Sequence, residues 1–219
     1  MPATPAWPRV SPKPTLVLFV RHAVTPTTGK VLPGRAPGLH LSSAGERQAE
    51  AVAKRIAAVP GVKAVYASPL ERARETAGPI AAACGLRVAA DAGLLECDFG
   101  QWTGARLKAL ARKPEWSIVQ RHPSGFRFPG GESFVEMQAR VAAAVQRLVA
   151  RHPGETIVAV SHADPIKVAV ATALGTHLDL FQRVTVATAS VTAVAYHAHG
   201  PVVVTVNSVD GDLAWLGTP

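Results

Sequence analysis

Short apolar runs alternate with amphipathic stretches along most of the chain. The run from Thr15 to Val20 is almost continuously apolar, which is typical of a strand buried on both faces of a sheet. Similar short runs at 62–67, 86–89 and 156–160 predict three further strands. Ala-rich or amphipathic segments between them predict helices. This alternation predicts a largely parallel sheet that helices cover on both faces.

Capping signals locate the starts of these helices. Helix starts are predicted at Ser43 with Glu46, at Ser68 with Pro69 and Glu71, at Ser133 with Glu136, and at Asp164 with Pro165. The corresponding helices are expected to run to about Val59, Gly85, Arg151 and Gly175. Each helix therefore follows or precedes a predicted strand with only a short connection.

The last part of the chain has a different pattern. Val- and Thr-rich segments at 190–196 and 202–207 are joined by HAHGP, which predicts an antiparallel hairpin. The fold class predicted is α/β, a three-layer sandwich with a mixed, mostly parallel sheet. We expect one domain over 15–219, with an insertion at about 104–131. The segment 1–14, which has five prolines, is predicted to be a flexible arm.

Composition restricts the partners that this domain is expected to bind. Lys and Arg exceed Asp and Glu by 23 to 15, a net charge of +8, which favours anionic partners such as phosphorylated metabolites. The positive residues are scattered, so nucleic acid is not expected. No apolar run approaches the ~18 residues of a membrane-spanning helix. Only Cys84 and Cys97 occur, which fits a reducing cytoplasm better than a disulfide framework.

Two predicted strands end in histidines. Arg21 and His22 follow the first strand, His162 follows the strand at 156–160, and Arg72 lies near the start of a helix. In a parallel sheet these groups come together at one edge, where imidazole can act as a nucleophile toward phosphorus and guanidinium groups can bind phosphoryl oxygens. HExxH, GxxxxGK and GxSxG motifs are absent. Histidines and arginines that only satisfy buried carbonyls or solvate the sheet edge are the structural alternative.

Five segments, taken together, resemble the motifs of the histidine phosphatase superfamily, also called phosphoglycerate mutase-like. They are VRHAVTPTTG, ASPLERARETA, LLECDFGQWTG, FPGGES and VSHADPIK, in the family's order. The chain is most similar to an actinobacterial group of phosphomutases or phosphatases. The resemblance implies an α/β sandwich and hydrolysis without a metal or organic cofactor.

The resemblance also implies roles for particular residues. His22 matches the nucleophile that becomes phosphorylated, and Glu96 matches the proton donor. Arg21, Arg72 and His162 match the family's residues that bind the phosphoryl group. Thr28 stands where many members of the family have an Asn that helps to bind phosphate. Asp98 and Asp164 are rival acids, although Asp164 is also expected to cap a helix and Asp98 to bind a nearby amide. Ala23 replaces the usual Gly, which would cost about 1 kcal/mol if its φ were positive.

Other side chains have two open interpretations. Trp102, Trp116, Phe126 and Phe128 either wall the substrate cleft or form a local apolar core. Positive residues near the insertion either select a substrate with several anionic groups or form a solvated face: Arg106, Lys108, Lys113 and Arg127. Arg74 is expected on the surface, as are His197 and His199 in the hairpin.

The function expected from these residues and the resemblance is a metal-independent phosphomonoesterase. It would hydrolyse a small phosphorylated metabolite through a phosphohistidine intermediate. A phosphomutase is the alternative within the family, and a non-catalytic module that binds phosphate or nucleic acid is the alternative from another class. The exposed edges of a Val/Thr-rich sheet are compatible with a homodimer, and no membrane contact is expected.

Overall fold

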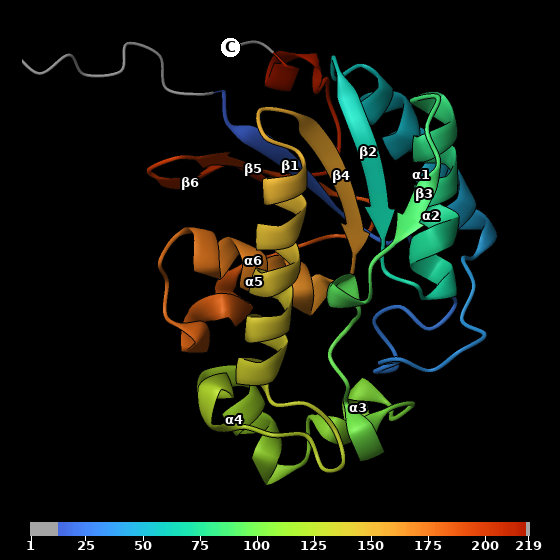
Figure 1. The fold of residues 1–219 in the computed structure, drawn as a ribbon. Coiled ribbons are helices and arrows are strands. Elements are labelled where there is room, and N and C mark those ends of the chain that lie inside the picture. The colour runs from blue at the N-terminus through green and yellow to red at the C-terminus, as the bar shows by residue number, and fades with distance from the viewer. Residues whose placement is uncertain (1–12, 218–219) are drawn as a thin grey trace, which may run out of the picture.

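The computed structural model describes residues 13–217, which form an α/β sandwich around one mixed sheet of six strands (Figure 1). The strand order is β3-β2-β4-β1-β5-β6. β1 pairs in parallel with β4, β4 with β2, and β2 with β3, while β5 and β6 are antiparallel additions. The strands are β1 Thr15–Arg21, β2 Val62–Ala67, β3 Val88–Ala90, β4 Thr156–Ser161, β5 Val191–His197 and β6 Gly200–Ser208.

Six helices and five 3₁₀ turns connect these strands within the described residues. The α-helices are α1 Ser43–Ala57, α2 Glu71–Ala83, α3 Leu107–Leu110, α4 Pro114–Arg121, α5 Phe134–Arg151 and α6 Ala163–Ala173. The 3₁₀ turns are η1 Ala92–Leu94, η2 Gly100–Trp102, η3 Pro123–Gly125, η4 Leu178–Arg183 and η5 Ala214–Gly217. The predicted order of strands and helices, and the final hairpin, are confirmed.

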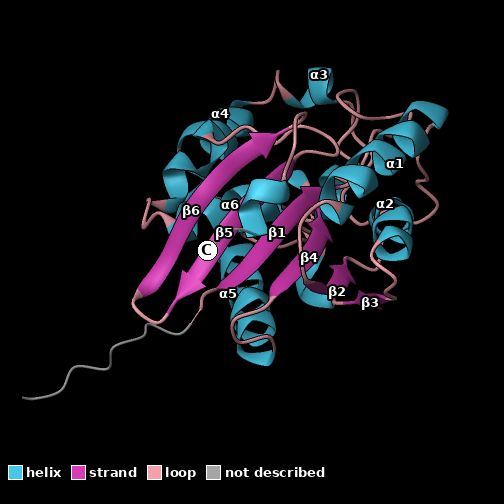
Figure 2. Cartoon of the chain, turned by 90° about the horizontal axis from the view of Figure 1, so that it is seen from above, coloured by secondary structure: helices cyan, strands magenta, loops and turns pink. Residues whose placement is uncertain are grey.

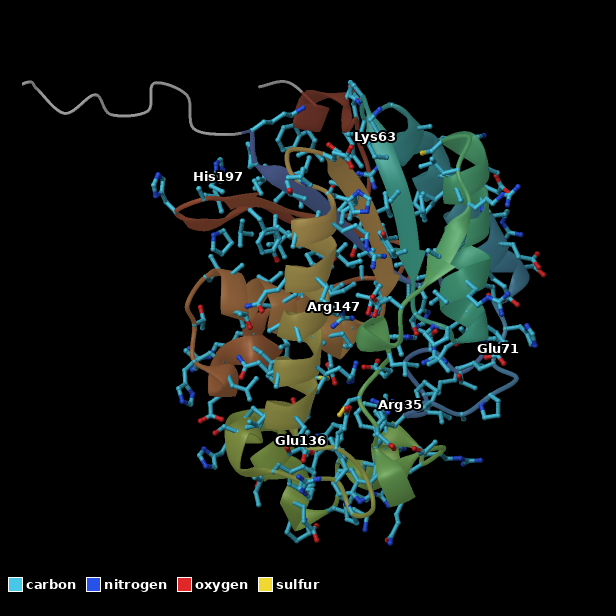
Figure 3. The ribbon with its side chains drawn as sticks, viewed as in Figure 1. Arg35, Lys63, Glu71, Glu136, Arg147 and His197 are labelled. Atoms are coloured by element: carbon cyan, nitrogen blue, oxygen red, sulfur yellow. The ribbon has the colours of Figure 1, made fainter. Side chains whose placement is uncertain are left out.

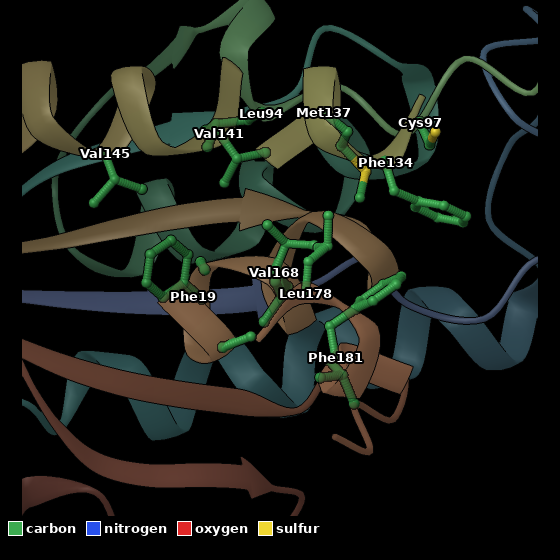
Figure 4. Close-up of a cluster of buried hydrophobic side chains, with 14 of the residues drawn as sticks. Phe19, Leu94, Cys97, Phe134, Met137, Val141, Val145, Val168, Leu178 and Phe181 are labelled. Carbon is green, nitrogen blue, oxygen red and sulfur yellow. The ribbon is translucent and has the colours of Figure 1, made fainter. Parts of the chain in front are cut away.

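Alternate residues of β1 pack into two separate cores because successive side chains of a strand point to opposite faces. Val17 and Phe19 join the core beneath α5 and α6, part of which Figure 4 shows. Leu18 and Val20 join the core beneath α1 and α2 on the opposite face. Figure 2 shows the sheet between these two groups of helices. The continuous apolar run at the start of the chain is thus the central, doubly covered strand.

Three predicted helix caps are wrong, and one is confirmed. Ser42, not Ser43, caps α1, because its side chain accepts a hydrogen bond from the Gly45 amide. α2 starts after Leu70 without a side-chain cap, so Ser68 is not its N-cap. His162 precedes α6, which places Asp164 inside its first turn. Both hydrogen bonds of the capping box predicted at 133–136 are present.

The backbone conformation at Ala23 answers the question of strain that the sequence raised. Ala23 does not have a positive φ, so the strain considered for this position does not arise. Among the described residues, no helix has the length and apolarity that crossing a membrane requires. The arm predicted at 1–14 lies outside the described residues except for Lys13 and Pro14.

Candidate active site

The site lies where β1, β2 and β4 end together, at the edge of the sheet toward which the arrows of β2 and β4 point in Figure 1. Register explains why the two histidines meet there. Arg21 pairs with Ser161 across the parallel strands, and the His22 amide donates to the Ser161 carbonyl at 2.9 Å. The rings of His22 and His162 therefore lie side by side, with centroids 5.2 Å apart.

His22 is held in a form suited to nucleophilic attack. Its Nδ1 lies 2.8 Å from the Ala23 carbonyl, which can only accept, so Nδ1 carries the proton and Nε2 keeps its lone pair. Burial, followed by the charge of Arg72, lowers the pKa of His22 to about 3. The imidazole is consequently neutral at physiological pH, and it lines a cavity of about 250 Å³.

Arg72 is a fully buried cation with spare hydrogen-bonding groups. It is 0% exposed, and its Nη2 donates to the Gly34 carbonyl at 2.8 Å. Its Nε and Nη1 have no hydrogen-bond partner within residues 13–217, and the same holds for Nε of Arg21. Buried guanidinium donors without partners are costly, so this arrangement favours a bound anion.

The second histidine is also fully buried. Nε2 of His162 lies 2.8 Å from Oγ of Ser68, the residue predicted to cap α2. Its Nδ1 has no partner in the described part of the chain. Burial, followed by the charge of Arg72, holds the pKa of His162 well below its usual value. Arg72 and His162 do not line the cavity, whereas Arg21 and His22 do.

Glu96 brings a carboxyl group into the same cavity. Its side chain is buried, and Oε1 accepts a hydrogen bond from the Cys97 amide at 2.9 Å. Burial first, and then the carboxylate of Asp164, raises the pKa of Glu96 to about 7. Such a group can exist in its acid form near neutral pH, which a general acid requires.

The two rival acids occupy different positions. Oδ1 of Asp98 accepts from the Gly100 amide at 3.0 Å, so this carboxylate braces its own loop and does not line the cavity. Asp164 does line the cavity, and Nζ of Lys167 lies 3.4 Å from its Oδ1. Thr28 lines the cavity too, with Oγ1 accepting from the Thr25 amide at 2.9 Å.

The aromatic residues divide between the two interpretations that the sequence left open. Trp116 and Phe128 line the cavity. Trp102 and Phe126 pack with Phe128 in the adjoining core, at centroid distances of 5.4 and 5.0 Å from it. The cleft wall and the local core are thus one continuous cluster.

Four basic residues of the insertion are exposed and do not line the cavity: Arg106, Lys108, Lys113 and Arg127. The structure instead places Lys167 and Gln182 on the cavity wall, 2.9 Å apart. Neither residue was predicted from the sequence to belong to the site. The position of Lys167, three residues after Asp164 in the same helix, was the available signal, since residues i and i+3 lie on the same face of a helix.

Histidine and carboxylate side chains are present at the site, but they are not arranged as metal ligands. In the range 13–217, the structure contains no group of three or more His, Cys, Asp or Glu side chains that could hold a metal ion. Both cysteines are free, and Cys97 is fully buried in the core beneath α5.

Together, the sandwich and the buried, partly unpartnered cations at its sheet edge describe an α/β protein with a positively charged site beside a neutral histidine. Residues 17–209 match the model of the histidine phosphatase superfamily (branch 1). The chain belongs to this superfamily.

Relatives and solved structures give the same family. A bifunctional protein of Mycobacterium tuberculosis is 35% identical over 91% of this chain and 55% of its own length. A probable phosphoglycerate mutase of Klebsiella pneumoniae is 33% identical over 93% of this chain and 95% of that protein. The structure of a mycobacterial glucosyl-3-phosphoglycerate phosphatase superposes with a TM-score of 0.81 at 25% identity, covering 90% of this chain and 100% of that one. The chain thus spans about half the length of the mycobacterial bifunctional relative.

Proposed function

We propose that this protein is a phosphomonoesterase that hydrolyses a small phosphorylated metabolite through a phosphohistidine at His22. The observation that carries the proposal is the set of unpartnered buried nitrogens on Arg21, Arg72 and His162, beside a neutral His22. Arg21 and Arg72 both lower the pKa values of His22 and His162, so the four side chains lie close together. A phosphoryl group that enters beside Arg21 and His22 would supply the acceptor oxygens and the negative charge that these nitrogens lack.

In the first step, Nε2 of His22 forms a bond to phosphorus while the bond from phosphorus to the ester oxygen breaks. Arg21, Arg72 and His162 stabilise the charge on the three remaining phosphoryl oxygens. Glu96, in its acid form, gives its proton to the departing alkoxide. The raised pKa of Glu96 supports this role because it keeps a useful fraction of the carboxyl protonated near pH 7.

In the second step, water attacks phosphorus and the bond to His22 breaks. The Glu96 carboxylate formed in the first step accepts the proton of this water. Inorganic phosphate then leaves, and both His22 and Glu96 return to their starting protonation states. No group other than the described side chains, water and the substrate is needed to balance the reaction.

The size and lining of the cavity support a small substrate. Its volume of about 250 Å³ fits a metabolite better than a polymer, and its walls combine Trp116 and Phe128 with Lys167 and Gln182. A phosphomutase is the second candidate, since one relative is a probable phosphoglycerate mutase. The mutase would return the phosphoryl group of His22 to another hydroxyl of the bound substrate. We propose in addition that the protein works in the cytoplasm, because both of its cysteines are free and a reducing compartment keeps thiols in that form.

Hydrolysis of p-nitrophenyl phosphate in the presence of EDTA tests this proposal. We expect wild-type activity that resists EDTA and a loss of at least about 10³-fold in His22→Ala, because the nucleophile is gone. Acid-labile, alkali-stable protein-bound phosphate should appear in the wild type and not in the variant. A folded wild type that neither hydrolyses the ester nor becomes phosphorylated would contradict the proposal. A phosphorylated protein that transfers its phosphoryl group to phosphoglycerates faster than to water would indicate the mutase.

A further inference from the structure

Gly34 and Arg35, in the loop between β1 and α1, join two parts of the site through adjacent residues. The Gly34 carbonyl accepts from Nη2 of Arg72 at 2.8 Å. Nε of Arg35 donates to the main-chain carbonyl of Glu96 at 2.9 Å. Figure 3 shows Arg35 between α2 and α3, at the end of the molecule where β1, β2 and β4 end. One short segment therefore contacts both the buried phosphoryl-binding cation and the proposed proton donor.

A second arginine reaches the same stretch of main chain from α5. Arg140 donates to the carbonyls of Gly93 at 3.0 Å, Leu95 at 2.9 Å and Glu96 at 3.3 Å. The carbonyl of Glu96 thus accepts from two guanidinium groups, one from the loop between β1 and α1 and one from α5. The carbonyls of this loop are not paired within a strand or an α-helix, so side-chain donors supply their hydrogen bonds.

Glu132 connects the two arginines into a clamp, defined here as Arg35, Glu132 and Arg140. Its Oε2 lies 2.8 Å from Nη2 of Arg35, and its two oxygens lie 2.8 and 2.9 Å from Nε and Nη2 of Arg140. Glu132 also accepts from the Asp98 amide at 3.1 Å. Burial alone would raise the pKa of Glu132, but its bonds to Arg140 and Asp98 outweigh burial and keep the carboxylate ionised.

The main-chain position of Glu96 decides where its carboxyl group lies. Oε1 is bound to the next amide of the same loop, so the side chain moves with the loop as one body. Catalytic groups lose large factors in rate when they are displaced by about 1 Å. A clamp on the Glu96 carbonyl therefore acts on proton transfer without touching the substrate.

We infer that Arg35 is a positioning residue that fixes the Glu96 carboxyl relative to the phosphoryl pocket. The inference rests on the proposed function. Arg35 does not line the cavity, so its effect is on proton delivery to the leaving group and on activation of water. Because Gly34 binds Arg72 and Arg35 binds Glu96, the geometry of the phosphoryl pocket and that of the acid are set by the same loop.

Leaving-group dependence separates this role from general destabilisation. Alkyl phosphates need a proton on the leaving oxygen, whereas p-nitrophenolate leaves without one. We expect Arg35→Ala to lower kcat for an alkyl phosphate by about 10- to 100-fold and to change histidine phosphorylation by p-nitrophenyl phosphate less than about 3-fold. Hydrolysis of the phosphohistidine should slow, so a burst of p-nitrophenol and a phosphorylated protein should accumulate. Arg35→Lys should resemble Arg35→Ala, because an ammonium cannot span the Glu96 carbonyl and Glu132 in fork geometry.

Arg55→Ala is the matched control. Arg55 also braces a loop, with bonds to the carbonyls of Ser208 and Gly211 at 3.1 and 2.9 Å, but it does not line the cavity. This variant should keep the wild-type ratio of alkyl to aryl rates. An Arg35→Ala protein that slows every substrate equally, or none, overturns the inference while wild-type phosphohistidine still supports the proposed function. A wild type that forms no phosphohistidine removes the proposed function itself, and the inference with it.

Discussion

At the residue scale, burial shifts the pKa values of the two groups that react first, and it shifts them in opposite directions. Burial lowers the pKa of His22 to about 3 and raises that of Glu96 to about 7. Both shifts favour the neutral form, since a charged group loses solvation when it is buried. A neutral imidazole is a nucleophile, and a neutral carboxyl is a proton donor. One physical effect thus prepares both partners of the first step.

Glu96→Gln tests the acid directly. The amide has no transferable proton, so we expect kcat for an alkyl phosphate to fall by about 10²- to 10⁴-fold, with a smaller loss for histidine phosphorylation by p-nitrophenyl phosphate. In the wild type, alkyl ester cleavage should decline as the pH rises through about 7, because the acid form is lost. Rates measured from pH 5 to 9 should show this decline in the wild type only. A variant that retains the same decline would assign the proton to another group, with Asp164 the nearest alternative in the cavity.

At the element scale, the sequence predicted every strand of the sheet but misplaced three helix caps. Strands are marked by local apolar runs, whereas an N-cap depends on which hydroxyl meets a free amide. Ser42 and Ser43 are adjacent and chemically identical, so only backbone geometry distinguishes them. Ser68 has the composition of a cap, but its hydroxyl binds His162 from the neighbouring strand end.

The same reasoning applies to the site. Residues at strand ends could be predicted because the topology of a parallel sheet brings them together: Arg21, His22 and His162. The clamp could not, since Arg35 and Glu96 are 61 residues apart and their contact depends on the path of two irregular loops. Lys167 was overlooked because only the orientation of α6 decides that it faces the cavity.

The cap of α1 gives a test with an internal control. Ser42→Ala should lower the free energy of unfolding by about 1 kcal/mol, because the Gly45 amide loses its acceptor. Ser43→Ala, inside the helix, should change it by less than about 0.5 kcal/mol, since alanine is the better helix former. Urea unfolding of both variants provides the measurement. Equal losses in the two variants would show that the hydroxyl of Ser42 is not what stabilises the helix start.

At the scale of the whole molecule, the sheet concentrates segments from distant parts of the chain at one edge. β1, β4 and β2 are adjacent in the sheet, although β2 and β4 are separated by the entire acid loop, the insertion and α5. The neutral groups gathered there belong to the folded state only. In the unfolded chain they regain ordinary pKa values, so folding and protonation are linked.

This linkage predicts how stability changes with pH. Between pH 5 and 6.5, His22 and His162 bind protons in the unfolded chain but stay neutral in the folded protein. Each histidine therefore makes the free energy of unfolding increase as the pH rises. Glu96 has the opposite sign, because it is protonated when folded and ionised when unfolded. With two histidines on one side and one carboxyl on the other, the unfolded chain binds about one proton more than the folded protein. The free energy of unfolding should therefore rise with pH by on the order of 1.4 kcal/mol per pH unit. Exposed His40, whose pKa Glu75 raises, opposes this weakly because solvent screens the pair.

Variants of the opposing groups separate these contributions. Glu96→Gln removes the group of opposite sign, so its free energy of unfolding should rise more steeply with pH, by up to about twice the wild-type slope. His22→Asn removes one of the two histidines and should nearly flatten the curve over the same interval. Urea unfolding at pH 5.0, 5.5, 6.0 and 6.5 gives the three slopes. If the slopes are the same in all three proteins, the buried histidines and Glu96 are not the groups that link folding to pH. The order Glu96→Gln, wild type, His22→Asn follows only if these residues are neutral in the folded protein, as the first step of the proposed reaction requires.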